Sequence, residues 1–257
     1  MPITSRLQRL LLARLVLDAN RAVTREQLLD ALWDERPPPT AGKALQVQVH
    51  RLRGLLGPDR IATTPTGYRL RVGPGELDSE RFEAALLAGR GQLAAGDPAT
   101  AADTFRAALD LWRGAPFADA ADHGFADHEA ARLGELRAVI LEERIEADLA
   151  LARHHDLVAE LTALVAADPL RERLHAQLML ALYRAGRQTE ALEVYHRARI
   201  ALDEGAGLAP GPALRDLQRA ISGGSMSSRR RSRGGGTCPR RAPSWSGATR
   251  SWRSSTA

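Results

Sequence analysis

The sequence predicts a mainly α-helical protein with more than one domain, and three observations support that fold class. Ala and Leu dominate a chain of 257 residues in which apolar residues make up 44% and aromatic residues only 4%. Ala and Leu are strong helix formers, whereas strands are enriched in β-branched and aromatic side chains. Prolines separate stretches of helical periodicity, and the length suits one large or two smaller domains. The single cysteine, Cys238, excludes a disulfide framework.

Charge divides the chain into a basic start, an acidic body and a basic end. Residues 1–75 carry a net charge of +6 and residues 76–222 carry −9, while the stretch from Gly223 onward holds eight Arg and no acid. A basic segment gains affinity for a polyanion by releasing its counterions, and an acidic segment does not. We therefore expect nucleic acid to be bound by the ends of the chain rather than by its body.

The basic start is predicted to contain three helices. Leucines at helical spacing indicate a first helix over residues 5–18. Thr24 is a good N-cap for a second helix, which carries its apolar side as far as Trp33 and is stopped by three prolines, 37–39. Thr40 is then expected to cap a third helix over Ala41–Leu56.

The third helix has two chemically different sides. Leu45, Val49, Leu52 and Leu56 are spaced four, three and four residues apart, so we expect them to share one buried face. The opposite side and its flanks carry Lys43, Gln46, Val47, Gln48, His50, Arg51 and Arg53. Lys and Arg neutralise phosphates, and Gln and Arg also make bidentate contacts to base edges. The alternative, a solvated polar helix face without a ligand, is disfavoured by the elements on either side.

A two-stranded hairpin is predicted over Arg60–Val72. Ile61, Thr63 and Thr64 lie along one strand, and a turn over residues 65–67 leads to the other. We expect Thr64, Thr66 and Arg69 to reach the sugar-phosphate backbone, and Tyr68 to anchor the hairpin to the core. Two helices, a proline turn and a hairpin in this order predict a winged helix-turn-helix DNA-binding domain over residues 1–74.

The acidic body, residues 77–222, is predicted to be entirely helical. Three segments beginning at Gly96, His154 and Gly186 each have a turn residue, an Ala five positions on, and Phe105, Ala163 or Tyr195 nine positions on. The last two segments are 32 residues apart, close to the period of tetratricopeptide-like helical hairpins. In this interpretation the small Ala allows close helix approach, the aromatic ring fills the gap, and the stack offers a surface for protein partners.

Two stretches carry a family resemblance. A-L-Q-V-Q-V-H-R-L-R followed by T-G-Y-R-L resembles the winged helix of response-regulator-type activators, and more specifically the SARP-type antibiotic regulatory activators. The stretch from Pro169 to Leu192 and P-G-P-A-L-R-D-L-Q from Pro210 are similar to the bacterial transcriptional activator domain that follows this winged helix in the same family. Such domains usually open with a small N-terminal sheet, which is expected to be missing here. Many relatives also have a basic residue near the wing tip, where this chain has Thr64 and Thr66.

The resemblance implies a transcription activator that binds double-stranded promoter DNA at repeated sites and contacts RNA polymerase. It also leaves room for a homodimer on DNA. A second hypothesis is a protein-binding helical-repeat scaffold whose DNA binding has been impaired by loss of the N-terminal sheet. A remnant of a larger nucleotide-regulated switch is a third.

No other functional class has a motif in the sequence. A P-loop, the zinc motif H-E-x-x-H and the nucleophile motif G-x-S-x-G are absent, so we expect neither an enzyme nor a cofactor. The neighbouring His154 and His155 point apart on a helix, which argues against a metal site. No apolar run approaches the roughly 20 residues of a membrane span, and the default compartment is the cytoplasm.

The tail, residues 223–257, has no periodicity and almost no aliphatic residue. It is expected to be either a disordered basic arm that binds DNA non-specifically or an out-of-frame segment. With GC-rich codons assumed, a shifted reading from Trp245 becomes V-G-R-D-A-E-L-A-E-L-D-R, similar to the start of the nucleotide-binding domain found in longer relatives. Both alternatives remain open at the level of sequence.

Overall fold

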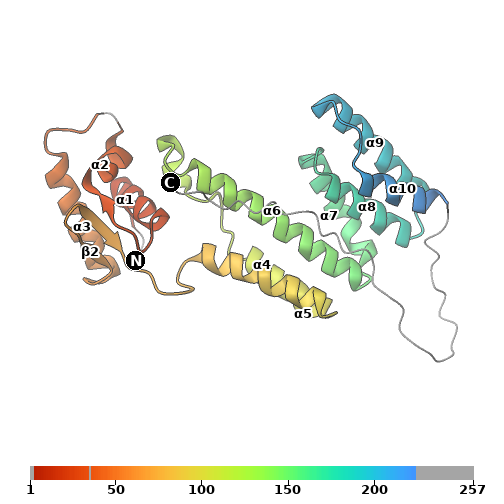
Figure 1. Ribbon diagram of the computed structural model, residues 1–257, viewed down its shortest axis with the longest axis horizontal. Helices are drawn as coiled ribbons and strands as arrows, with labels where there is room; N and C mark the ends of the chain where they lie inside the picture. Colours follow the sequence, from red (N-terminus) through yellow and green to blue (C-terminus); the bar gives the residue numbers. More distant parts are fainter. Residues whose placement is uncertain (1–2, 35, 224–257) are drawn as a thin grey trace, which may run out of the picture.

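The computed structural model describes residues 3–34 and 36–223, so the predicted tail from residue 224 onward lies outside the described residues. Figure 1 shows a small unit built from the first helices and strands, a central group around the long helix α6, and a second helical group from α7 to α10. The mainly α fold is confirmed, with a winged helix-turn-helix followed by helical hairpins. Among the described residues, no helix combines the length and the apolar character needed to cross a bilayer.

Three helices and their caps form most of the winged unit, and they closely match the prediction. They are α1 (Arg6–Leu17), α2 (Arg25–Trp33) and α3 (Ala41–Leu56). Thr24 caps α2 through a capping box, because its hydroxyl accepts from the Gln27 N–H and the Gln27 side chain accepts from the Thr24 N–H. The expected cap of α3 differs, since the Thr40 side chain makes no capping hydrogen bond and the Ala41 N–H instead donates to the Pro38 carbonyl.

The predicted hairpin is part of a three-stranded antiparallel sheet. Strands β1 (Val23–Thr24), β2 (Ile61–Thr63) and β3 (Gly67–Leu70) lie in the order β1-β3-β2. The two-residue strand β1 was missed because so short a segment has no periodicity to detect. Gly67 is required opposite Thr24, since a Cβ built there would lie 2.0 Å from the Val23 carbonyl oxygen. The sheet is thereby joined to the start of α2.

The apolar face of α3 is shorter than its spacing predicted. Leu45, Val49 and Leu52 are buried among α1, α2 and the sheet. Leu56 is 37% exposed, because α3 ends there and the chain turns away at Gly57 before a fourth contact can form. Gln48, which was placed on the flank of the polar side, is buried as well.

The body consists of two groups of helices that share α6. The elements are α4 (Asp78–Ala94), α5 (Pro98–Leu109), the 3-10 helix η1 (Ala118–His123), α6 (Asp127–Ala150), α7 (His154–Ala167), α8 (Glu172–Arg184), α9 (Gln188–Ala206) and α10 (Pro212–Ser222). Ile140 and Ala147 of α6 pack with α4 and α5, whereas Ile145 and Leu149 pack with α7 to α10. The central helix therefore holds two separate apolar cores on different sides.

The repeat interpretation holds for two of the three segments. Ala101 and Ala191 are fully buried, and Phe105 fills a gap so narrow that a Cβ on Gly89 would lie 2.3 Å from its ring. In the middle segment the interpretation was wrong, because Ala163 is exposed, as is Ala159, while leucines of α7 are buried instead. Larger side chains thus replace the small-residue contact in α7.

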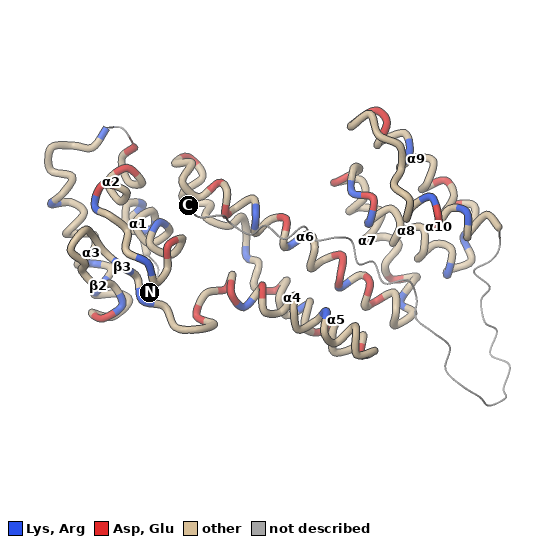
Figure 2. The backbone as a smooth tube through the Cα atoms, in the orientation of Figure 1, with Lys and Arg blue, Asp and Glu red and all other residues tan. Residues whose placement is uncertain are grey.

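Ion pairs follow the same central helix. Figure 2 shows acidic positions recurring along α6. Glu143 pairs with Arg90 of α4 at 2.9 Å and with Arg173 of α8 at 3.2 Å, so its carboxylate joins the two groups of helices. Asp148, which is almost fully buried, accepts from Arg153 at 2.8 Å and from Arg144 at 3.1 Å. Hydrogen bonds from several guanidinium groups offset the free-energy cost of removing a carboxylate from water, so these acids can lie on an inner helix face.

The connection between α5 and α6 packs against the winged unit. Ala120 and Ala126 are buried in the same core as Leu10 and Leu11 of α1. Arg9 of α1 donates to Asp119 at 2.8 Å. The two parts of the chain are therefore joined by an apolar contact as well as by the short linker after the hairpin.

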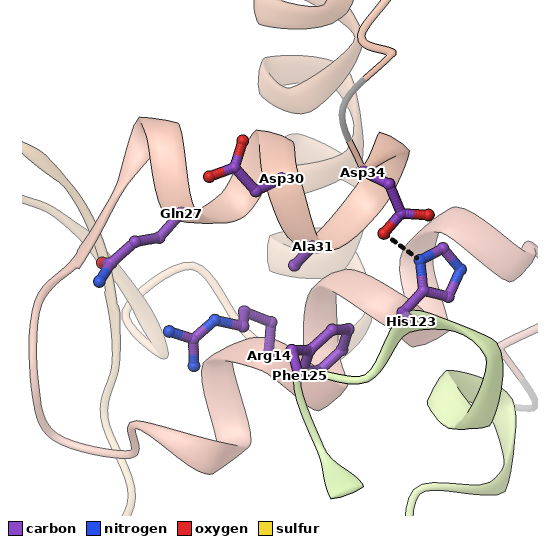
Figure 3. Close-up of a pocket in the computed structure, with 7 residues that line it drawn as sticks. All are labelled: Arg14, Gln27, Asp30, Ala31, Asp34, His123 and Phe125. Atoms are coloured by element: carbon purple, nitrogen blue, oxygen red, sulfur yellow. Dashed lines mark ion pairs between the residues drawn. The ribbon is translucent and has the colours of Figure 1, made fainter.

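A hollow of about 570 Å³ lies at this junction. Figure 3 shows His123 and Phe125 of the connection on one side and Arg14, Asp30 and Asp34 on the other, with His123 Nδ1 3.5 Å from an Asp34 carboxylate oxygen. The hollow opens widely to solvent, so it marks the edge of the domain contact.

Candidate nucleic-acid interface

The outer side of α3 presents most of the predicted recognition residues together. Lys43, Gln46, Val47, His50 and Arg51 are all exposed on the side of the helix opposite its buried face. Val47 is 46% exposed, so its methyl groups are open to a partner on this side of α3. The Pro38 turn connects α2 to α3, and the buried face of α3 packs against the core of the winged unit. The exposed stripe therefore projects away from that core.

The cations of this surface have no acidic partner nearby. Among the described residues, no carboxylate oxygen lies within 4.0 Å of the nitrogens of Lys43, Arg51 or Arg69. Arg60, at the base of the hairpin, is paired instead. Its guanidinium forms a bidentate ion pair with the Glu76 carboxylate, with hydrogen bonds of 2.6 and 2.7 Å. Hydrogen bonds from Arg60, with the Gly73 N–H, lower the pKa of Glu76 to about 2. Lys43 and Arg51 on α3 and Arg69 on the wing therefore keep their charges exposed to solvent.

Sequence reasoning missed one basic residue of this region, Arg25. A hollow of about 430 Å³ lies beside the first turns of α3, lined among others by Arg25, Lys43, Gln46 and Tyr68. Arg25 follows the N-cap of α2, and its backbone N–H donates to the Thr66 carbonyl at 3.0 Å. Its nearness to Lys43 depends on the β1–β3 pairing, for which the sequence has no separate signal.

The wing places its predicted residues unequally. Thr66 and Arg69 are exposed, Thr66 in the turn and Arg69 on β3. Thr64 is half-buried, and its hydroxyl oxygen accepts from the Gly67 N–H at 3.0 Å, so it supports the turn. Tyr68 is buried, as expected for an anchor. The wing is short and closely attached to α2.

Arg53 lies differently from the rest of the predicted stripe. Its guanidinium is turned onto the hairpin, where Nε donates to the Ile61 carbonyl at 2.9 Å and Nη2 donates to the Thr63 hydroxyl at 2.8 Å. The guanidinium carbon also lies 6.0 Å from the centre of the Tyr68 ring. Helical phase put Arg53 beside the exposed stripe, but only the packing of the hairpin against α3 determines which way so long a side chain points.

Two family models match the chain. The bacterial transcriptional activator domain matches residues 77–222, and the model described as transcriptional regulatory protein, C terminal, matches residues 3–70. Together they cover the winged unit and the helical body.

Curated relatives agree with these matches. The chain is 44% identical to the regulatory protein AfsR of Streptomyces coelicolor over 83% of its own length, but it spans only 22% of that protein. It is 38% identical to the regulatory protein DnrI of Streptomyces peucetius, with 80% of each chain covered. The first of these relatives is therefore several times longer than this chain.

A solved structure has the same fold. The chain matches Mycobacterium tuberculosis EmbR, solved in complex with a low affinity phosphopeptide, with a TM-score of 0.81 and 36% identity. The match covers 87% of this chain and 61% of that one. With both family models, the relatives and this structure in agreement, the chain belongs to the SARP-type family of antibiotic regulatory activators, a family of transcription regulators, and contains their winged helix-turn-helix and bacterial transcriptional activator domains.

Proposed function

We propose that this regulator is a sequence-specific activator that inserts α3 into the major groove of promoter DNA and lays the wing on the backbone. The observation that carries the proposal is the exposed stripe of Lys43, Gln46, Val47, His50 and Arg51, opposite a buried face and without a carboxylate partner among the described residues. An α-helix fits the major groove, and unpaired cations gain free energy there by releasing counterions.

Each residue of the surface has a role that suits its chemistry. Lys43 and Arg51 are placed to neutralise phosphates, and the amide of Gln46 can pair with an adenine edge. Val47 offers an apolar contact for a thymine methyl group, and His50 a hydrogen bond. Arg69 and Thr66 serve the sugar-phosphate backbone from the wing, with Thr64 supporting the turn. Arg53 belongs to the same surface, although the hairpin occupies two of its donors.

The helical body is proposed to contact RNA polymerase. Residues 76–222 carry a net charge of −9, which disfavours phosphate and leaves their outer faces to protein. Repeated sites spaced by a full turn of DNA would place two copies on the same side of a promoter, with or without a homodimer contact. The family membership supports this division of labour.

A gel-shift series with promoter fragments tests the DNA part of the proposal. We expect a retarded complex with selected fragments that competitor DNA does not remove, and footprints that recur at a regular spacing. Arg215→Ala on α10 is the matched control, because it removes one exposed charge far from α3 and should leave the shift intact. A folded protein that shifts no fragment selectively would favour the alternative, a protein-binding helical-repeat scaffold with impaired DNA binding.

A further inference from the structure

The outer strand of the wing pairs with a neighbouring strand on one side alone among the described residues. Strand β2 lies at the end of the sheet. Two backbone hydrogen bonds join the ends of β2 to the β3 side. The Arg71 N–H donates to the Arg60 carbonyl, and the Thr64 N–H donates to the Gly67 carbonyl. Since antiparallel pairing alternates, Ile61 and Thr63 turn their own backbone groups toward the open edge. An edge strand without a partner on one side is held less firmly than a central one.

Arg53 occupies that open edge. It contributes Nε to the Ile61 carbonyl at 2.9 Å and Nη2 to the Thr63 hydroxyl at 2.8 Å, with its guanidinium beside Tyr68. Thr63 and Tyr68 are directly opposite each other in the β2–β3 register. One side chain from the recognition helix therefore binds the outer strand at two points and contacts the strand behind it.

We propose that Arg53 is a positioning residue that fixes the wing against α3, with Thr63 as its side-chain acceptor, so that Arg69 meets the DNA backbone while α3 lies in the groove. Arg53 touches the hairpin and acts on DNA through it. The inference rests on the proposed DNA-binding function. A rigid guanidinium fork suits this task, because its two donors reach a carbonyl and a hydroxyl at once, which one ammonium group cannot do in the same geometry.

Two variants separate positioning from direct contact with DNA. Thr63→Val removes the acceptor hydroxyl without changing any charge, and Arg53→Lys keeps the charge but loses the fork. Both should weaken binding of a selected promoter fragment by about tenfold, and Thr63→Ser should restore parent affinity. If Arg53 instead neutralised a phosphate itself, Thr63→Val would bind like the parent and Arg53→Lys would keep most of its affinity. That pair of results would overturn the proposal.

Coupling to Arg69 is the second readout. In a double-mutant cycle, Arg69→Ala should cost less affinity in the Thr63→Val protein than in the parent, because a displaced wing no longer brings Arg69 to the backbone. Additive losses would show that Thr63 and Arg69 act independently and would count against a wing fixed by Arg53.

Amide hydrogen exchange of the full chain without DNA tests the same idea independently of DNA binding. Thr63→Val and Arg53→Lys should speed exchange of the Ala62 and Thr64 amides, which face β3, by about tenfold while α1 stays protected, and Arg215→Gln should change neither. If the parent protein binds no promoter fragment selectively, the proposed function is wrong. The amide-exchange rates of the variants still show whether Arg53 holds the wing against α3. Unchanged exchange in Thr63→Val would overturn the inference even if DNA is bound. Thr63→Val carries the test if Arg53→Lys does not fold.

Discussion

Lys43 and Gln46 are one turn apart on α3 but offer DNA different chemistry. The ammonium group of Lys43 is a point charge with three donors, whereas the Gln46 amide has a donor and an acceptor in one plane. A charge neutralises any phosphate it meets, but a planar amide matches an adenine edge and fails to match the other bases. The two side chains should therefore affect different parts of the binding free energy.

Alanine substitutions at these two positions should separate affinity from specificity. Lys43→Ala should weaken binding to all DNA sequences alike and reduce the slope of log affinity against log salt by about 0.9. Gln46→Ala should cost about 1–3 kcal/mol on the preferred site and relax selection at one base pair. Titrations at several salt concentrations against a panel of single-base variants measure both. An unchanged salt slope for Lys43→Ala would contradict its assignment to a phosphate.

Two glycines of the winged unit should respond in opposite directions to alanine. A Cβ at Gly67 would lie 2.0 Å from the Val23 carbonyl oxygen, so Gly67→Ala should force β1 and β3 apart and lower the unfolding free energy by about 1–3 kcal/mol. Gly54 is helical and has open space at that position, so Gly54→Ala should raise the unfolding free energy by about 0.5–1 kcal/mol. Urea denaturation of both variants gives the comparison, and equal effects would contradict the β1–β3 contact.

At the scale of elements, α8 carries polar groups into a largely apolar core. His175 is 2% exposed, and its Nε2 lies 2.9 Å from the Pro169 carbonyl oxygen. Burial lowers the pKa of His175 below its ordinary value of 6.5, with Arg197 acting in the same direction. The Pro169 hydrogen bond, and after it the carboxylates of Glu172 and Asp168, raise the pKa of His175 but do not cancel the effect of burial. The folded state therefore prefers the neutral ring.

A lowered histidine pKa makes the helical body sensitive to mild acid. The unfolded chain binds the proton near pH 6.5 and the folded chain only at lower pH, so the stabilisation is complete above 6.5 and declines as pH falls below it. We expect a loss of at most about 1.4 kcal/mol per pH unit from this group. Denaturation at pH 7.5 and 5.5 should show a smaller pH dependence in His175→Gln. The exposed His196→Gln is the control, and an identical pH dependence in all three proteins would contradict the assignment.

At the scale of the whole molecule, the winged unit shares its core with the connection between α5 and α6. Ala120 and Ala126 are buried with leucines of α1, and the Arg9–Asp119 pair lies beside them. An ion pair that is this exposed contributes roughly 0–1 kcal/mol, so the apolar contact accounts for most of the attachment. The DNA-binding and helical parts are thus held in one orientation by the packing of a single loop.

A charge placed in that contact should loosen the attachment of the two parts. Ala120→Asp would bury an unpaired carboxylate, so we expect residues 117–126 to leave the α1 surface, with faster amide exchange there and a broader distance distribution in small-angle scattering. Ala107→Asp adds the same charge at an exposed position of α5 and should change neither measurement. Parent-like scattering and exchange in Ala120→Asp would contradict a fixed orientation.

Local patterns in the sequence predict the three helices and the hairpin of the winged unit, the helical character of the body and most of the candidate DNA surface. Helical spacing of leucines, the Thr24 cap and the proline turn are local signals, because they depend on residues within one or two turns of each other. The exposed stripe on α3 followed from the same periodicity, since a helix with one buried face must present the other.

The contacts that join distant segments depend on how separately formed elements pack. Strand β1 forms only because β3 comes to lie beside Val23, and the connection around Ala120 enters a core more than a hundred residues earlier in the chain. Arg53 turns to the wing because the outer edge of β2 lies within its reach and offers it a carbonyl and a hydroxyl. Such contacts leave no short-range pattern, because their free energy depends on where two separately formed elements meet.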